Sequence, residues 1–153
     1  MENITLPSIQ QFNHSSFFPV INHRKEAHSA MEFIHKVNIG LRSPNSKIRT
    51  LSGGNQQKSI VGRWLLRNLD VLLFIEPTRG IDVGTKAEIY RLLSTLAAQG
   101  KAIIVVSTDH IEIMGISDRI FVMYKGRLNK VFTKNDTTEE ELLSEIQGGN
   151  NHE

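Results

Sequence analysis

Hydrophobic and polar positions follow two periods along this chain. Apolar residues recur at helical spacing in three places: about Glu26 to Asn38, the run of Ile60, Val61, Trp64 and Leu65, and the segment between Asp82 and Gly100. Two short continuous apolar runs, Val71–Ile75 and Ala102–Val106, are typical of strands covered on both faces, as in parallel sheets. This succession of segments predicts a mostly parallel α/β fold.

The C-terminal third has a different pattern. Ile120–Tyr124 and Arg127–Phe132 flank a Lys125-Gly126 turn, which predicts a strand pair. Thr138 and Glu141 have capping-box spacing and open a last short helix through Ile146. The segment from Gly148 onward is expected to fray.

Ser52-Gly53-Gly54 stands directly before a helical run. Such a turn leaves backbone N–H groups pointing one way at the positive end of the helix dipole, which favours an anion such as a nucleotide phosphate. Glycine lets the backbone approach closely, and the Ser52 hydroxyl adds a donor. The alternative is an ordinary N-cap with a glycine-rich turn. This alternative is weakened by the residues that follow, Asn55-Gln56-Gln57-Lys58, and by the apolar strand after them.

Glu76 follows the apolar run Val71–Ile75, and Pro77, which has no N–H for a sheet ladder, ends that strand. Open α/β sheets bind their ligands at the carboxyl ends of strands. A carboxylate there can serve as a general base when it reaches the reacting water. A carboxylate that only caps a turn is the alternative. Asp82 is predicted to N-cap the next helix.

Two stretches carry a family resemblance, Leu51–Lys58 and Glu76–Gly84. They resemble the signature motif and the Walker B/D-loop region of ATP-binding cassette (ABC) domains, specifically the second cassette of tandem-domain sugar importers of the ribose/galactose/xylose type. The similarity covers most of the chain and is weak before Leu51. It implies an incomplete P-loop NTPase-like ABC ATPase fold. Residues 1–50 would be part of the helical subdomain, 51–147 would hold the signature, Walker B, D-loop and switch, and 148–153 would be a flexible tail.

The resemblance also implies roles for single residues. Glu76 would polarise the water that attacks the γ-phosphate, and Thr108 stands at the switch position, where many ABC domains carry His. His110 is read as an exposed residue in the first turn of a helix. Nucleotide contacts would come from the signature and the D-loop: Leu51, Ser52, Gly53, Gly54, Asn55, Gln56, Gln57 and Asp82.

Two departures from the family pattern change what the chain is expected to do. No G-x-x-x-x-G-K-[ST] phosphate loop occurs among the 153 residues, and Ile75 stands where the family carries the Walker B aspartate that helps hold Mg²⁺. The chain therefore resembles a truncated product, a remnant or one piece of a split gene. Without the strand of the phosphate loop, apolar surface of Val71–Ile75 and Ala102–Val106 is expected to stay uncovered. ATP and Mg²⁺ would be reached only through a partner cassette domain.

Two function classes remain open. The first is an ATPase component of a monosaccharide importer, inactive alone, working with another cassette and with membrane permease subunits at the inner face of the cell membrane. The second is a non-catalytic remnant or interaction module that donates only its signature motif. An ABC ATPase of DNA repair is a third reading, and the lack of coiled-coil heptads around the signature argues against it.

Composition narrows the possible kinds of protein and of binding site further. The chain has no Cys, which gives no disulfide framework or Cys-based metal site and suits the cytoplasm. A net charge of +2 from dispersed basic residues is not a nucleic-acid footprint. The histidines are scattered without metal-ligand spacing, so no metal site is expected in the chain itself. No apolar run has the length of a membrane span.

Overall fold

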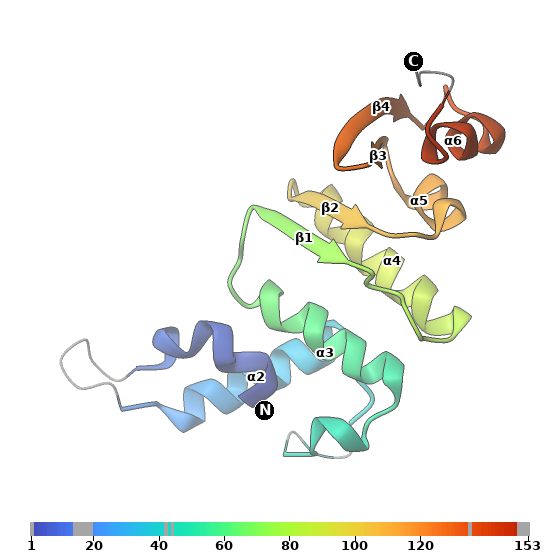
Figure 1. Ribbon diagram of the computed structural model, residues 1–153. Helices are drawn as coiled ribbons and strands as arrows, with labels where there is room; N and C mark the ends of the chain where they lie inside the picture. Colours follow the sequence, from blue (N-terminus) through green and yellow to red (C-terminus); the bar gives the residue numbers. More distant parts are fainter. Residues whose placement is uncertain (1, 14–19, 42, 44, 135, 150–153) are drawn as a thin grey trace. The chain divides into compact units, whose positions relative to one another are not determined.

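The computed structural model describes residues 2–13, 20–41, 43, 45–134 and 136–149 (Figure 1). The chain divides into two compact units, residues 1–104 and 105–153, with the boundary inside β2. The elements of the first unit are α1 Glu2–Thr5, the 3-10 helix η1 Leu6–Phe12, α2 His23–Lys36, the 3-10 helix η2 Ile48–Thr50, α3 Gly53–Leu65, β1 Val71–Ile75, α4 Val83–Ala98 and the start of β2 Ala102–Val106. Those of the second are α5 His110–Ile116, β3 Arg119–Tyr124, β4 Arg127–Thr133 and α6 Glu139–Ile146.

The helix boundaries follow from capping residues read in the sequence. Ser52 caps α3, and Asp82 caps α4 by accepting from the Thr85 backbone N–H. Gly100, at φ +86°, takes the left-handed position just past α4. Thr138 and Glu141 form the predicted capping box at the start of α6. The helix expected from Glu26 begins three residues earlier, because Asn22 accepts from the Lys25 N–H.

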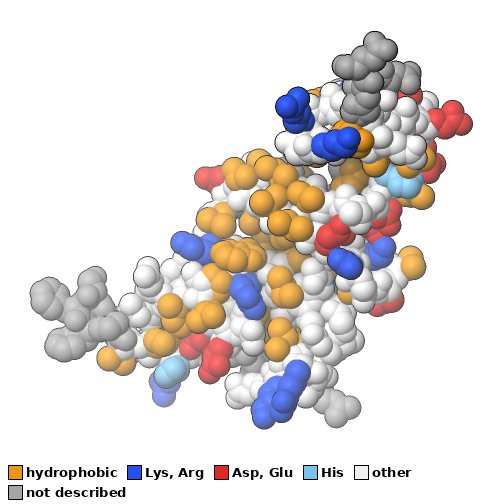
Figure 2. Space-filling model, in the orientation of Figure 1, with side chains coloured by type: hydrophobic (Ala, Val, Ile, Leu, Met, Phe, Trp, Pro, Cys, Tyr) orange, Lys and Arg blue, Asp and Glu red, His pale blue; other side chains and the backbone are white. Residues whose placement is uncertain are grey.

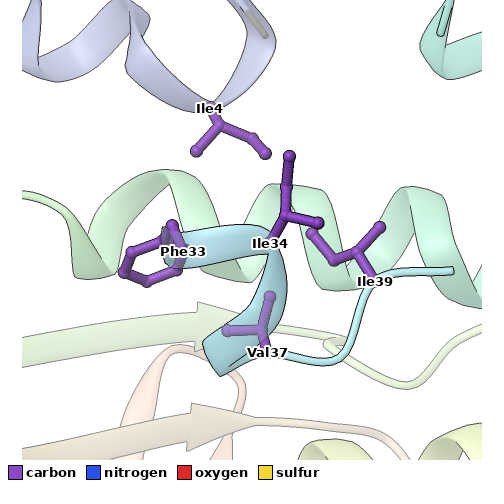
Figure 3. Close-up of a cluster of buried hydrophobic side chains, with 5 residues drawn as sticks. All are labelled: Ile4, Phe33, Ile34, Val37 and Ile39. Atoms are coloured by element: carbon purple, nitrogen blue, oxygen red, sulfur yellow. The ribbon is translucent and has the colours of Figure 1, made fainter. Parts of the chain in front are cut away.

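Helices α1 and α2 meet in a core of the first unit. Figure 3 shows its buried side chains converging from these helices and from the segment after α2: Ile4, Phe33, Ile34, Val37 and Ile39. Leu65 and Leu66 at the end of α3, and Leu92 of α4, pack against this cluster. The core thus holds α3 and α4 within one unit. Helix α3 begins at the Ser52-Gly53-Gly54 turn, and α4 begins directly after Asp82.

Strand β1 has the predicted bounds, and its two faces differ in burial. Leu72 and Phe74 are buried, whereas Val71, Leu73 and Ile75 are 57%, 59% and 69% exposed. Only one face of the strand is covered, as expected for a sheet that lacks the strand of the phosphate loop. Strand β1 pairs with β2, and Figure 2 shows hydrophobic side chains gathered over β1. Nothing among the described residues packs over the odd-numbered face, so apolar side chains remain in water.

The second unit is built on the predicted strand pair. Strands β3 and β4 are antiparallel, with Ile120 opposite Phe132, and they are joined by Lys125 and Gly126, both at positive φ. One face of this hairpin packs on α6 through Ile120, Val122, Phe132 and Leu142. The other face exposes Phe121 and Met123.

The end of the predicted flexible tail, residues 150–153, lies outside the described residues. In the described part of the chain, no helix is long and apolar enough to cross a bilayer. Within the same residues, no group of three or more His, Cys, Asp or Glu side chains could hold a metal ion.

Candidate functional site

The turn of Ser52, Gly53 and Gly54, here called the signature turn, begins α3. Ser52 and Gly53 are exposed, and Gly54 is buried. The first N–H groups of a helix have no partner within it, so the amides of Gly53 and Gly54 stand at the positive end of the α3 dipole. An exposed helix start with no side chain on its first residue leaves space for a phosphate oxygen to approach the backbone.

Asn55 holds the signature turn in place. Its Nδ2 donates to Ser52 Oγ at 2.9 Å, and its Oδ1 accepts from the Gly40 N–H at 2.9 Å. The Asn55 backbone N–H donates to the same Ser52 Oγ at 3.4 Å. Because Ser52 Oγ accepts from both groups, its own O–H is directed away from Asn55. The side chain that the sequence placed among nucleotide contacts is thus engaged in positioning Ser52.

The next residues also bond back toward the turn. Gln56 Nε2 donates to the Leu51 carbonyl oxygen at 2.9 Å, which fixes the residue before the cap. Gln57 is half-buried on α3. Leu51 packs its side chain against the helical core. These contacts of Leu51 and Gln56 support the turn.

The D-loop, Thr78–Asp82, lies beside the signature turn. A Cβ at Gly53 would come within 3.7 Å of the Gly80 carbonyl oxygen, and a Cβ at Gly54 would come within 2.6 Å of Thr85. Gly80 has φ +75°, a conformation that glycine adopts without steric cost. Two motifs some thirty residues apart therefore present their backbones together in one unit.

Asp82 ends the D-loop and is held by Thr85. The Thr85 N–H donates to Asp82 Oδ1 at 3.0 Å, and the Thr85 hydroxyl donates to Asp82 Oδ2 at 2.8 Å. The Thr85 backbone N–H, followed by the Thr85 hydroxyl, holds the pKa of Asp82 below its usual range. Asp82 is therefore a charged cap of α4 at neutral pH.

This cap predicts a pH-dependent contribution to stability. Because the folded-state pKa is lowered, the contribution is present above the ordinary Asp pKa of about 4 and is lost as the pH falls through the lowered value. We expect Asp82→Ala to reduce the free energy of unfolding at neutral pH, and the difference from the parent chain to shrink in acid. Urea unfolding across this pH range measures it. Ser52→Ala removes an uncharged cap and serves as the control, and a difference for Asp82→Ala that does not change with pH would contradict the assignment.

Glu76 follows β1 directly in an unusual backbone conformation. Its φ is +48°, in the left-handed region that non-glycine residues seldom occupy, and its carbonyl oxygen accepts from the Arg79 N–H at 3.3 Å. Strain of this kind gathers at functional sites. Ile75, at the position of the family's Walker B aspartate, points an apolar side chain into solvent. Thr78 is buried, and its Oγ1 accepts from the Tyr90 hydroxyl at 3.2 Å, so α4 also supports the start of the D-loop.

Thr108 lies in the second unit, in the exposed bend between β2 and α5. Asp109 caps α5 by accepting from the Glu112 N–H at 3.1 Å. His110 is the first residue of α5, as predicted, but it is half-buried and its Nε2 lies 3.0 Å from Glu139 Oε1. That contact to α6 gives His110 a structural role within its unit.

Sequence reasoning missed the residues that join α3 to α4. Thr85 and Glu88 are about thirty residues from the signature motif, and nothing in their local spacing marks them. The apolar face of α4 is buried at Ile89, Leu93 and Leu96, and Ala97 is exposed. The sequence showed Lys58 as the last residue of the motif, but it gave no sign that this side chain is buried.

The chain is similar to curated ATP-binding proteins over nearly its whole length. It is 41% identical over 149 residues to the ribose import ATP-binding protein RbsA of Geobacillus kaustophilus, and 49% identical over 144 residues to the arabinose import ATP-binding protein AraG of Rhizobium meliloti. These matches span 97% and 94% of this chain. The chain belongs to the ATP-binding cassette family. This cassette chain spans only 30% and 28% of the length of those two relatives.

Solved structures agree with that family. The cassette chain superposes on a dimeric bacterial ABC transporter cassette, MJ0796, with a TM-score of 0.71 and 27% identity, covering 87% of this chain and 55% of that one. A post-hydrolysis state of MJ0796 with ADP and phosphate bound gives a TM-score of 0.72 at 26% identity. A scan against protein-family models finds no match. The incomplete ABC ATPase fold expected from the sequence is thereby confirmed.

Proposed function

We propose that this chain supplies the signature half of a composite ATP site in a monosaccharide importer. The observation that carries the proposal is the placement of the signature turn beside the D-loop in a single unit. An exposed helix start next to a glycine-containing loop forms a surface suited to a phosphate held from the other side. The relatives named for ribose and arabinose import support the sugar class.

The residues fit one side of ATP and Mg²⁺ only. Ser52, Gly53 and Gly54 would donate to phosphate oxygens, Asn55 would keep Ser52 oriented, and Asp82 would keep the D-loop at the start of α4. The lysine and the glycine-rich loop that surround phosphates in P-loop enzymes have no counterpart among the 153 residues. ATP and Mg²⁺ would therefore be held mainly by a second, intact cassette domain.

The remaining parts of the proposal follow from the family. Residues 1–50 would belong to the helical subdomain, and 51–147 would carry the signature, Walker B, D-loop and switch. Membrane permease subunits would be the further partners, with the assembly at the cytoplasmic face of the cell membrane. Glu76 and Thr108 would be the catalytic and switch positions of any complete site built with this chain.

The direct test is association with an intact cassette domain of a sugar importer. We expect the 153-residue chain to co-purify with that domain in the presence of ATP and Mg²⁺, and to separate from it when either is omitted. The intact domain should carry a Glu→Gln change at its own catalytic position, so that bound ATP persists. Binding that ignores nucleotide would contradict the composite site and leave the alternative, a non-catalytic remnant.

We expect the chain alone to hydrolyse ATP no faster than the buffer background. Positioning and charge neutralisation supply nearly all phosphoryl-transfer catalysis, and the groups that perform them are not among these residues. Ile75→Asp should not raise turnover, although its exposed side chain makes the change tolerable. Phosphate release is the measurement, with an intact cassette domain as positive control. Turnover that disappears in Glu76→Gln would contradict this prediction.

A further inference from the structure

A buried lysine joins the two helices behind the candidate site. Lys58 of α3 is 7% exposed, forms an ion pair with Glu88 of α4, and donates from Nζ to the Asn38 carbonyl oxygen at 2.9 Å. Asn38 lies just beyond α2, at φ +51°. One ammonium group therefore connects the end of α2 with both helices that carry the site.

Helices α3 and α4 also touch one helical turn closer to the site, where Gly54 meets Thr85. Gly54 and Lys58 are four residues apart on α3, and their neighbours Thr85 and Glu88 are three residues apart on α4, so each pair shares a helix face. The close approach at Gly54 and Thr85 leaves no room for a Cβ on Gly54. The same Thr85 holds Asp82 through two hydrogen bonds. The α3–α4 interface thus has two contacts one helical turn apart, and the one at Thr85 reaches the D-loop through Asp82.

We propose that Lys58 is a positioning residue that holds the signature turn and the D-loop as one unit, so that both meet the same ATP. The proposal rests on the composite-site function above and assigns Lys58 and Glu88 a role in it. A buried ammonium group is seldom the most stable side chain at such a position, because an apolar side chain avoids the desolvation cost. What a directed ion pair adds is a defined register between α3 and α4.

Hydrogen exchange of the chain itself gives the first test, because it needs no partner. We expect Lys58→Met to raise exchange together at the amides of residues 55–56, which bond to Ser52, and of residues 85–86, which bond to Asp82. The expected rise is roughly tenfold, the size expected when one coupled contact is removed. Lys58→Arg keeps the charge and the donors and should stay close to the parent chain. Arg91→Gln, at an exposed position of α4, is the matched control for charge removal.

Glu88→Gln gives a second route if Lys58→Met fails to fold, since the Glu88 side chain is 40% exposed. It should raise exchange at the same two segments. Unchanged exchange in Glu88→Gln, or a rise confined to one segment, would overturn the proposal. In the ATP-dependent association assay, Glu88→Gln should raise the dissociation constant by about tenfold. Coupled exchange without any association of the parent chain would instead refute the composite-site function and leave the coupling of the two loops established.

Discussion

We expect Gly53→Asp to abolish the ATP-dependent association of this chain with an intact cassette domain. Gly53 is the first residue of α3 and is exposed at the positive end of the helix dipole. A carboxylate at this position would occupy the space of the phosphate and repel its charge at short range. Like charges that face each other across a closed interface cost several kcal/mol. The loss of association should therefore be complete at micromolar protein.

The substitution separates a loss of binding from a loss of fold. A Cβ at Gly53 would meet only the Gly80 carbonyl oxygen, at 3.7 Å, which is ordinary van der Waals contact. An acidic residue in the first turn of a helix is also favourable for the helix. Gly53→Asp should therefore fold like the parent chain, and circular dichroism and urea unfolding should confirm it.

Ser94→Asp adds the same charge at an exposed position of α4 and is the matched control. It should associate like the parent chain. Gly54→Ala makes an informative contrast, because a Cβ there would lie 2.6 Å from Thr85 and should disturb the α3–α4 contact. Association of Gly53→Asp at the level of Ser94→Asp would show that no phosphate approaches the signature turn.

Phe74→Ala should reduce the free energy of unfolding of the first unit by about 3–5 kcal/mol. Phe74 is 7% exposed on the covered face of β1, so removing its ring leaves a cavity. Whole domains are stable by only about 5–15 kcal/mol, and this unit keeps an apolar face in water. The variant is therefore expected to lose a large part of its stability and to unfold at a clearly lower urea concentration than the parent chain.

The neighbouring position gives the opposite expectation. Ile75 is 69% exposed, so Ile75→Thr should change the free energy of unfolding by less than about 0.5 kcal/mol. It should also increase the fraction of soluble monomer, because it makes the uncovered face less apolar. The single tryptophan, Trp64 on α3, reports unfolding of this unit by fluorescence. Equal costs at positions 74 and 75 would show that both faces of β1 are covered in solution.

The sequence alone determined much of the local structure. The apolar runs predicted β1 and β2 with their bounds, and Ser52, Asp82 and Thr138 predicted the starts of α3, α4 and α6. These features follow from backbone hydrogen bonding within a few residues, so a short stretch of sequence contains the whole cause. The same holds for the signature and D-loop motifs, from which the family was recognised.

Only the tertiary structure decided which surfaces are covered and which distant residues meet. The run Val71–Ile75 is apolar throughout, yet its odd-numbered side chains lie in solvent, because burial depends on what packs over each face. The contacts of Gly54 with Thr85 and of Lys58 with Glu88 join residues about thirty positions apart, and no local pattern encodes such a distance. The motifs could be read in the sequence, but their arrangement on one surface results from the packing of α3 and α4.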